Sequence, residues 1–410
     1  METINFDIAA DRRGTNSVKW DKKAIESIAS NPEAEPFWVA DMDFLPEPHI
    51  KAKTMEIAEN GIFGYPSDSS KLNSLFCSWL LKKHNWTINP ENAVFTMGLL
   101  HGIALAVDLF TEEGDRILVP TPAYRPFRTL TEEAGRIVEE MPLHYENGIF
   151  SLDHASFKEH AERCSMILFC SPHNPSGLVF SDEDLRFILE CSKKLDIPVL
   201  SDEIHADLVH PSAHHIPMGK VNDSIGANCI TFMAPSKTFN VAGEHSAFAV
   251  FSNGDMKKRF TKKQSALCVS HPGYLIGELS EAAYRNGIEY NKKLCAYLEE
   301  NANTIRSYLK ENCPELKLTN GNASFVTFID CTEIYAKVRK KVESDPERYE
   351  GGDEGGILSR FFGVEAGVAM NDGTWFGDEY YGFVRFNYGT SRECILKALK
   401  RITDAVRSLK

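Results

Sequence analysis

The sequence lacks several features that would place it in a specialised class of protein. Its 10 cysteines include no C-x-x-C pair, so neither a disulfide framework nor a zinc site is predicted. Lysine and arginine number 45 against 58 aspartates and glutamates, and this excess of negative charge argues against a nucleic acid or an anionic membrane as partner. No apolar run approaches the roughly 18 residues that span a bilayer. The first residues lack the basic and apolar segments of a signal peptide, so we expect a cytoplasmic location.

What the sequence does contain is an alternation of short apolar runs and helical segments. The apolar runs, which we expect to form buried strands, lie at residues 116–120, 166–170, 197–200, 229–233 and 247–251. Because the segments between them are long enough for helices, the pattern predicts a largely parallel sheet covered by helices on both faces. A chain of 410 residues with 43% hydrophobic content can bury a large core of this kind.

Several helix boundaries can be predicted from capping residues. Thr96 is placed to cap a strongly apolar helix, and Ser181 is placed to cap the helix that follows it. Thr390 and Glu393 can form a capping box for the last helix. By contrast, residues 340–356 are first charged and then rich in glycine, which predicts a solvated, mobile loop.

One lysine stands where a charge is costly. Lys237 lies between the apolar runs 229–233 and 247–251. Taken alone it would more often be an exposed loop residue. If it is buried, desolvation lowers its pKa and leaves the neutral amine that Schiff-base chemistry uses.

Three further polar residues follow apolar runs in the same way. Tyr124, Asn174 and Asp202 each come just after a predicted strand, as Lys237 does. In parallel α/β sheets, ligands bind beyond the carboxyl ends of the strands. We therefore expect these four side chains to meet at one site.

This set of residue types fits pyridoxal 5′-phosphate. That cofactor needs a lysine for covalent attachment, a carboxylate beside its ring nitrogen, a donor to its phenolate oxygen, an aromatic platform and donors to its phosphate, while the substrate carboxylate needs an arginine. We predict Lys237 for the covalent attachment, Asp202 for the ring nitrogen and Asn174 for the phenolate oxygen. Tyr124 is the predicted aromatic platform, and Arg385 is predicted to bind the substrate carboxylate. The predicted donors to the phosphate are Ser236 and the amides of Gly98, Leu99 and Leu100.

The motifs resemble those of the fold-type I pyridoxal-phosphate enzymes, the aspartate aminotransferase superfamily. The resemblance is carried by Asn174-Pro175 with Gly177, Asp202-x-x-His205, Ser236-Lys237 and Arg385-x-Asn387. Within the superfamily the chain is most similar to the bacterial C–S lyase branch, the cystathionine β-lyases of the MalY/PatB type. This closer match rests on residues 12–20, 38–44, 61–65, 122–127, 172–175, 201–205 and 376–377. The resemblance covers nearly the whole chain.

The resemblance implies a fold and an assembly. A three-layer α/β domain with a mostly parallel sheet is expected over residues 48–288. A smaller α+β domain built from both chain ends is expected over residues 1–47 and 289–410. A homodimer is also implied, because Tyr65 would contact the phosphate of the cofactor in the neighbouring subunit and serve catalysis there.

The resemblance implies the same roles for the residues named above and adds several more. Lys237 would both hold the cofactor and move the Cα proton. His205 would lie beside the cofactor, where many aminotransferases have a tyrosine, while Trp38 and Asp41 would lie at the substrate. The sequence after Lys237 lacks the phosphate-binding arginine common in aminotransferases, and His245 or backbone amides are expected to replace it.

Four histidines crowd one stretch of the chain, at positions 205, 210, 214 and 215. Their spacing matches no zinc pattern and no cysteine accompanies them. We expect no metal site, and a loop of partly exposed histidines instead.

Three functions remain open at this stage. The first is α,β-elimination from an L-amino acid with a sulfur substituent on Cβ, such as L-cystathionine, giving a thiol, pyruvate and ammonia. The second is aminotransfer from an amino acid to a 2-oxo acid, which uses the same residues. The third is a regulatory protein that keeps the cofactor and acts through a partner.

Overall fold

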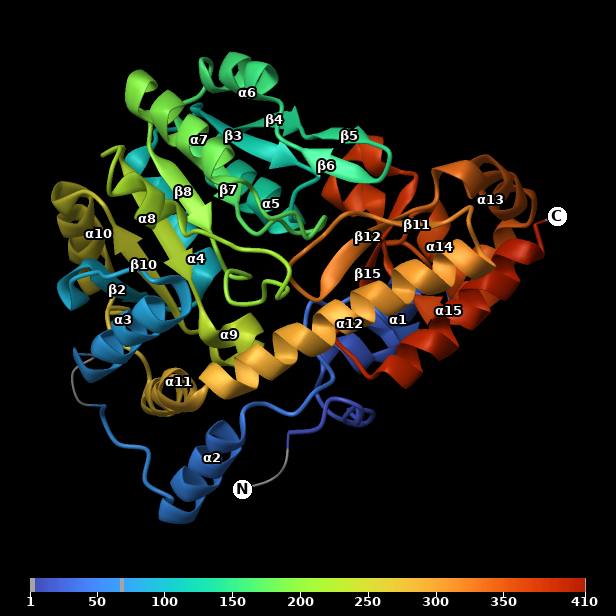
Figure 1. Ribbon diagram of the computed structural model, residues 1–410, viewed down its shortest axis with the longest axis horizontal. Helices are drawn as coiled ribbons and strands as arrows, with labels where there is room; N and C mark the ends of the chain where they lie inside the picture. Colours follow the sequence, from blue (N-terminus) through green and yellow to red (C-terminus); the bar gives the residue numbers. More distant parts are fainter. Residues whose placement is uncertain (1–3, 67–69, 410) are drawn as a thin grey trace.

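The computed structural model describes residues 4–66 and 70–409, and its largest element is a seven-stranded sheet (Figure 1). In spatial order the strands are β2 (Ala93–Thr96), β10 (Ala247–Phe251), β9 (Cys229–Met233), β8 (Val199–Asp202), β7 (Met166–Cys170), β3 (Arg116–Thr121) and β4 (Ile137–Pro142). Only β10 is antiparallel to its neighbours. The expected mostly parallel α/β sheet is confirmed, and each of the five apolar runs forms one of its strands.

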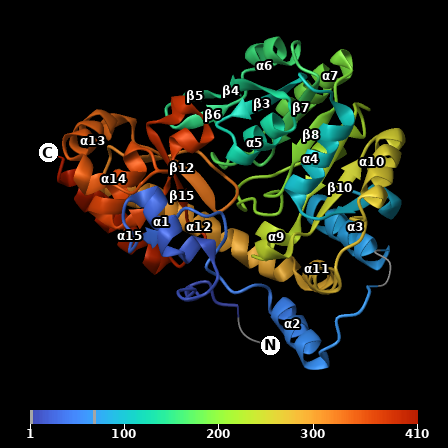
Figure 2. The same cartoon turned by 180° about the vertical axis from the view of Figure 1, so that it is seen from behind.

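Helices cover both faces of this sheet, which explains why its central strands read as unbroken apolar runs. Every residue of β7, β8, β9 and β10 is buried. One face packs against α4 (Leu99–Phe110), α5 (Arg125–Glu133) and α10 (Gly254–Ala266), which lie in front of the sheet in Figure 2. The other face packs against α6 (His154–Ala161), α7 (Asp182–Leu195) and α8 (Met218–Asn222).

A second, four-stranded sheet lies beside the first and is antiparallel. Its strands are, in order, β11 (Lys317–Leu318), β12 (Val326–Asp330), β15 (Phe383–Asn387) and β14 (Asn371–Asp372). The helices around it are α13 (Thr332–Ser344), α14 (Ile357–Ala366), α15 (Arg392–Arg407) and the long α12 (Ile288–Asn312), which runs from one sheet to the other (Figure 1). The N-terminal α1 (Lys22–Ala29) and β1 (Glu35–Pro36) join this region, where β1 pairs with β13 (Val368–Ala369). The division into domains at residues 48 and 288 stays a prediction.

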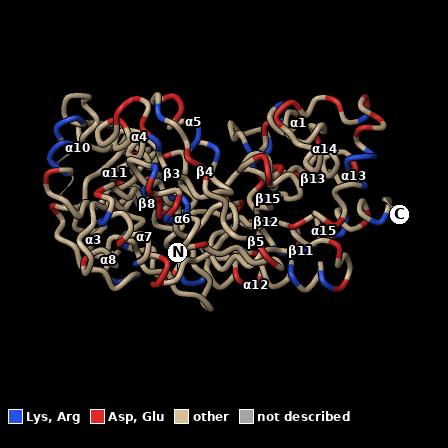
Figure 3. Tube along the Cα trace, turned by 90° about the horizontal axis from the view of Figure 1, so that it is seen from above, with Lys and Arg blue, Asp and Glu red and all other residues tan. Residues whose placement is uncertain are grey.

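The remaining elements connect these two sheets or project from them. They are α2 (Pro48–Asn60), α3 (Ser70–His84), α9 (Pro235–Thr238), α11 (Tyr274–Asn286), β5 (His144–Glu146), β6 (Ile149–Ser151) and six short 3-10 helices, η1 (Val18–Trp20), η2 (Pro90–Asn92), η3 (Ala242–Glu244), η4 (Pro346–Tyr349), η5 (Gly373–Phe376) and η6 (Asp378–Tyr380). Helix α2 stands away from the body of the molecule in Figure 1. Within residues 4–66 and 70–409, no helix is both long and apolar enough to cross a bilayer. Lysines and arginines are interspersed with acidic residues along the trace (Figure 3).

The capping predictions were right for one helix and wrong for two. Ser181 caps α7 in a full capping box with Asp184. Helix α4 is capped by Gly98 rather than Thr96, because only a glycine readily adopts the φ of 89° found there. The last helix is capped by Ser391, whose hydroxyl accepts from the amide of Cys394, so the box predicted at Thr390 is one residue out of register.

The prediction of a solvated loop over residues 340–356 is right about solvent exposure for most of that stretch, but wrong about a loop in its first part. Its first residues complete α13 and form η4. Two of the glycines pack too closely for any side chain: a Cβ on Gly355 would lie 1.9 Å from the carbonyl oxygen of Ile28, and one on Gly356 would lie 2.1 Å from the carboxyl carbon of Asp372. Close approach, rather than freedom of movement, accounts for these glycines.

Gly287, between α11 and α12, offers a test of the packing around Phe239, which follows α9. A Cβ there would lie 2.2 Å from the ring of Phe239. Overpacking of this kind costs about 1–3 kcal/mol, so we expect Gly287→Ala to lower the free energy of unfolding by that amount in urea denaturation. Gly254→Ala is the control, because nothing lies within 4 Å of its Cβ position. Equal stability of the two variants would contradict the packing described here.

Candidate active site

A cavity of about 380 Å³ lies at the carboxyl ends of β7, β8 and β9. It is lined by nine residues predicted from the sequence to hold a cofactor: Gly98, Leu99, Leu100, Tyr124, Asn174, Asp202, His205, Ser236 and Lys237. These residues come from separate strand ends, so the sheet brings them together as the parallel topology requires. The predicted Trp38, Asp41, Tyr65 and Arg385 are not among the lining residues.

Lys237 is held on the single turn of α9 directly after β9. Its Nζ donates a hydrogen bond to the backbone oxygen of Ala40 at 2.7 Å. Burial lowers the pKa of the Lys237 amine to about 8; the negative charge of Asp41 opposes this shift and the positive charge of Arg385 adds to it. A substantial fraction of the amine is therefore neutral near physiological pH, the form that can act as a nucleophile or a base.

Asp202 ends β8 and is 4% exposed. Burial raises the pKa of its carboxyl to about 7, although its Oδ1 accepts the amide N–H of Ile204 at 3.0 Å. A cation placed against this carboxylate would favour its ionised form. The protonated ring nitrogen of pyridoxal phosphate is such a cation, so Asp202 fits that group.

The start of α4 provides a place for a phosphate. The first amides of a helix have no partner within the helix, and the helix dipole favours an anion there. Gly98 begins this helix, and a Cβ on it would lie 3.4 Å from Nδ1 of His245, so glycine keeps the approach open. Ser236 and His245 also line the cavity. Among the described residues its lining contains no arginine, in agreement with the sequence.

His205 is buried and neutral. Its Nδ1 lies 3.0 Å from Oγ of Ser324, and burial lowers the pKa of the ring to about 3. Tyr124 stands at the start of α5, where burial raises the pKa of its hydroxyl. At neutral pH both side chains therefore line the cavity without charge.

Arg385 is a buried cation on β15, 5% exposed. It donates to Oδ1 of Asn174 at 3.2 Å, Oδ1 of Asn371 at 2.8 Å and the backbone oxygen of Trp38 at 2.6 Å. Its Nε has no hydrogen-bond partner, and among the described residues no carboxylate forms an ion pair with it. Burial lowers the pKa of the guanidinium to about 10, which still leaves it charged at neutral pH. A buried charge without a counter-ion is costly, and a substrate carboxylate would supply one.

The segment 38–44 contributes its backbone to the site while its side chains point elsewhere. The indole of Trp38 donates to the backbone oxygen of Lys19 at 3.1 Å. Asp41 pairs with Arg12 at 2.7 Å and with Lys19 at 3.6 Å. A substrate-binding role for the side chains of Trp38 and Asp41 stays a prediction, whereas the carbonyls of this segment contact Arg385 and Lys237.

Two asparagines for which the sequence predicted no role hold this segment in place. Asn240 accepts the amide N–H of Met42 at 2.9 Å and donates to the carbonyl oxygens of Met42 and Phe44, both at 2.8 Å. Asn387 donates to the carbonyls of residues 39 and 41. Asn240 lies three positions after Lys237, and Asn387 lies two positions after Arg385 in the motif Arg385-x-Asn387. Their closeness in sequence to these two residues was the signal that could have identified them.

Asp207, also missed, fixes α9 from below. Its carboxylate accepts hydrogen bonds from Oγ1 of Thr238 at 2.9 Å and from the indole N–H of Trp79 at 3.0 Å. It also lies 2.7 Å from Nε2 of His84. It is 5% exposed. Because Thr238 is the neighbour of Lys237, this buried network positions the lysine.

The histidines of residues 205–215 do not form a loop of partly exposed side chains, which corrects that prediction. His205, His210 and His215 are buried, and only His214 is exposed. His210 lies 3.2 Å from the hydroxyl of Tyr388, and Nε2 of His215 lies 2.8 Å from Glu203. Each ring thus meets a different polar partner, which is why burial is tolerated.

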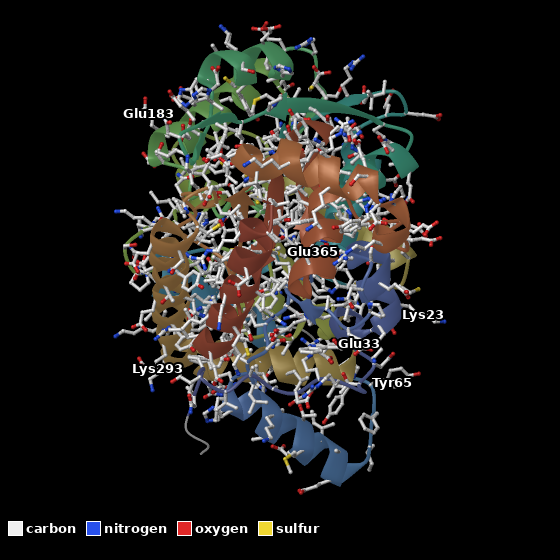
Figure 4. All side chains as sticks on the ribbon, turned by 90° about the vertical axis from the view of Figure 1, so that its right-hand side faces the viewer. Lys23, Glu33, Tyr65, Glu183, Lys293 and Glu365 are labelled. Atoms are coloured by element: carbon white, nitrogen blue, oxygen red, sulfur yellow. The ribbon has the colours of Figure 1, made fainter. Side chains whose placement is uncertain are left out.

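Tyr65 does not line this cavity on its own chain. It is fully exposed on the segment after α2, and Figure 4 shows it beside that projecting helix. Its predicted contact with a cofactor phosphate therefore requires another chain.

Comparison with known proteins identifies the family. Residues 38–402 match the model of the class I and II aminotransferases, so the chain belongs to that family. It is 32% identical to cystathionine β-lyase PatB of Bacillus subtilis (strain 168) over 405 residues, which cover 98% of this chain and all of PatB.

Two solved structures resemble this one over nearly its whole length. Cystalysin from Treponema denticola, which contains pyridoxal 5′-phosphate, has a TM-score of 0.88 at 26% identity and covers 100% of both chains. The pyridoxal-phosphate-bound C–S lyase from Staphylococcus hominis has a TM-score of 0.87 at 27% identity, covering 99% of this chain and 98% of its own.

The buried carboxylate of Asp202 leads to a prediction for the cofactor-free protein. Its pKa is about 3.8 when unfolded and about 7 when folded, so the folded state binds the extra proton between these values. Stability from this group is therefore lost as the pH rises from about 4 to about 7. We expect Asp202→Asn to unfold with a higher free energy than wild type at pH 8, on the order of 3 kcal/mol, and with a smaller difference near pH 4.

Urea denaturation at a series of pH values measures this difference. Asp182→Asn, at an exposed position of α7, controls for the loss of one negative charge. A difference between Asp202→Asn and wild type that stays constant from pH 4 to pH 8 would show that burial of the carboxylate is not its cause.

Proposed function

We propose that the protein is a pyridoxal-phosphate-dependent C–S β-lyase that eliminates the sulfur substituent from L-cystathionine or a related S-substituted L-cysteine. The products are a thiol, pyruvate and ammonia, which places the enzyme in amino-acid metabolism. The observation that carries the proposal is the partly buried Lys237, whose amine has a lowered pKa and shares one cavity with Asp202, Asn174 and Tyr124. Similarity to a named cystathionine β-lyase over the full length supports the choice of reaction.

The residues of the cavity fit the cofactor by chemistry and position. Lys237 would hold it covalently, Asp202 would face its ring nitrogen, Asn174 its phenolate oxygen and Tyr124 its ring. The phosphate would lie against Ser236 and the amides of Gly98, Leu99 and Leu100, with His205 nearby. When bound, pyridoxal phosphate supplies an electron sink for the carbanion formed at the substrate's Cα.

The chain itself supplies binding, orientation and proton transfer. Arg385 would bind the substrate's α-carboxylate, which gives the buried guanidinium its missing counter-ion. The Lys237 amine has a pKa of about 8, so it is mostly neutral above that pH. In its neutral form it takes the proton from Cα as a general base. The backbone oxygen of Ala40 and the Asp207–Thr238 hydrogen bond restrict where that amine can lie.

An aminotransferase is the second candidate, favoured by the description of the family to which the chain belongs. It would use the same lysine, aspartate and arginine. A regulatory protein that binds the cofactor and acts through a partner is the third candidate. Product analysis separates these three functions.

We also propose a cytoplasmic homodimer. Large apolar side chains are exposed together on the projecting segment, where Met55, Ile62 and Phe63 are each more than half exposed and Tyr65 is fully exposed. A second copy of the chain would cover this surface. In that assembly Tyr65 would contact the cofactor phosphate of the partner subunit.

Lys237→Ala provides the first test of the reaction. Purified wild type should release pyruvate from L-cystathionine, and borohydride should attach the cofactor permanently to Lys237, as mass spectrometry of its peptide can show. Loss of the attacking amine should reduce pyruvate release by at least about a thousandfold. Lys263→Ala, at an exposed position of α10, is the control. Transfer of amino groups to 2-oxo acids by wild type without pyruvate release would favour the aminotransferase.

Hybrid dimers test the position of Tyr65. Tyr65→Ala and Lys237→Ala are each expected to be nearly inactive alone. If Tyr65 acts across the interface, mixing the two variants and allowing exchange creates one site with both native side chains, and activity should return to about a quarter of wild type. No recovery in hybrids verified by native mass spectrometry would mean that Tyr65 does not act in the partner's site.

A further inference from the structure

A second cavity, of about 460 Å³, shares the wall residue Tyr124 with the first. One side is formed by the start of α5 with Arg125 and Arg128. The other side is formed by residues 353–356 and 374–378. The two cavities are therefore neighbours at Tyr124.

Two consecutive aromatic residues connect this second cavity to Arg385. The guanidinium of Arg385 lies 5.0 Å from the centre of the Phe376 ring, and that of Arg125 lies 5.2 Å from the centre of the Trp375 ring. The amide of Ala123 donates to the backbone oxygen of Phe376 at 2.8 Å, which holds this segment against the turn before α5. A second cation, Arg125, therefore contacts the residue next to the one that Arg385 contacts.

Arg125 is paired with Glu354 at 2.9 Å, and both side chains are about half exposed, at 51% and 53%. Exposed ion pairs contribute only about 0–1 kcal/mol, so a ligand can open this one at little cost. The two groups are nevertheless held in place. Arg125 rests on Trp375, while the backbone of Glu354 donates to the carbonyl of Ser27 at 2.8 Å and accepts from the indole of Trp375.

The remaining charges of the second cavity are mixed in sign. Arg128 pairs with Glu140, and Asp353 and Asp378 add further acidic groups. These carboxylates would repel a ligand that carries only negative charge, and the arginines would repel a ligand that carries only positive charge. A ligand end that carries both a carboxylate and an ammonium group can pair with Arg125 and Glu354 at the same time.

We propose that Arg125 and Glu354 form a distal subsite for the zwitterionic amino-acid end of the substrate's sulfur substituent. The carboxylate of that end replaces Glu354 on the guanidinium, and its ammonium group pairs with Glu354. This inference rests on the proposed function and narrows its substrate class to thioethers that carry an amino acid at each end. Cysteines with a short alkyl substituent on sulfur reach the first cavity only.

The test compares L-cystathionine with S-ethyl-L-cysteine in Arg125→Gln and Glu354→Gln. For each variant we expect the ratio of kcat/KM for cystathionine to that for S-ethyl-L-cysteine to fall about tenfold, mainly through KM. Arg339→Gln is the matched control, an exposed arginine of α13 paired with Glu343 at 2.7 Å. The control should leave the ratio unchanged. An unchanged ratio in both test variants, as for an ordinary surface ion pair, would overturn the proposal.

A titration of the cofactor's absorbance separates this inference from the proposed function. The absorbance change on adding either amino acid gives an apparent dissociation constant whether or not elimination follows. Tighter binding of cystathionine than of S-ethyl-L-cysteine, lost in Arg125→Gln, would support the subsite even if wild type released no pyruvate and the lyase proposal failed. Pyruvate release with equal affinity for the two compounds would overturn the subsite and leave the lyase proposal standing.

Discussion

Lys237 and Asp202 line the same cavity, and their removal from water moves their pKa values in opposite directions, to about 8 and about 7. Each ionised form is disfavoured because the sheet and its helices exclude water from the strand ends. The sheet can place both groups there because Asp202 ends β8 and Lys237 follows β9, and every residue of these two strands is buried. A cofactor that reacts with a neutral amine and carries a cationic ring nitrogen relieves both costs at once.

The rest of the structure holds that lysine from two sides. From below, Asp207 accepts from Thr238 and so ties α9 to Trp79 and His84 of α3. From the opposite side, segment 38–44 places the carbonyl of Ala40 against the amine. That segment is irregular, so its carbonyls depend on side chains, chiefly those of Asn240, Asn387 and Arg385, for hydrogen bonds. The active site is thus completed by a segment near the start of the chain and a strand near its end.

The same chemistry explains why the reaction is harder to assign than the cofactor. Elimination and aminotransfer both begin with removal of the Cα proton, and both use Lys237, Asp202 and Arg385. The subsite proposed to distinguish substrates lies further out, where Trp375 contacts Arg125 and Phe376 contacts Arg385. These two cations differ in setting, because Arg385 is buried without a counter-ion whereas Arg125 is half exposed and already paired. The first can bind any α-carboxylate, and the second can select among side chains.

The sequence by itself determined five strands of the large sheet, their order along the chain and the residues at their ends, but not β2 and β4. Unbroken apolar runs and the polar residues after them are local signals, and parallel topology turns them into one site for Tyr124, Asn174, Asp202 and Lys237. Helix caps were less certain: Ser181 was predicted correctly, whereas Gly98 and Ser391 were missed because each competes with a suitable neighbour one or two residues away.

Only the tertiary structure decided which contacts complete the site. The packed glycines of residues 352–356 have the composition of a free loop, and their role appears only beside Ile28 and Asp372. Asp207, Asn240 and the Arg125–Glu354 pair join residues from 31 to 229 positions apart, and no local pattern records such a distance. Lys237 could be recognised from the strands around it, but the lowered pKa of its amine depends on burial and the position of the amine depends on the carbonyl of Ala40, and folding alone supplies both.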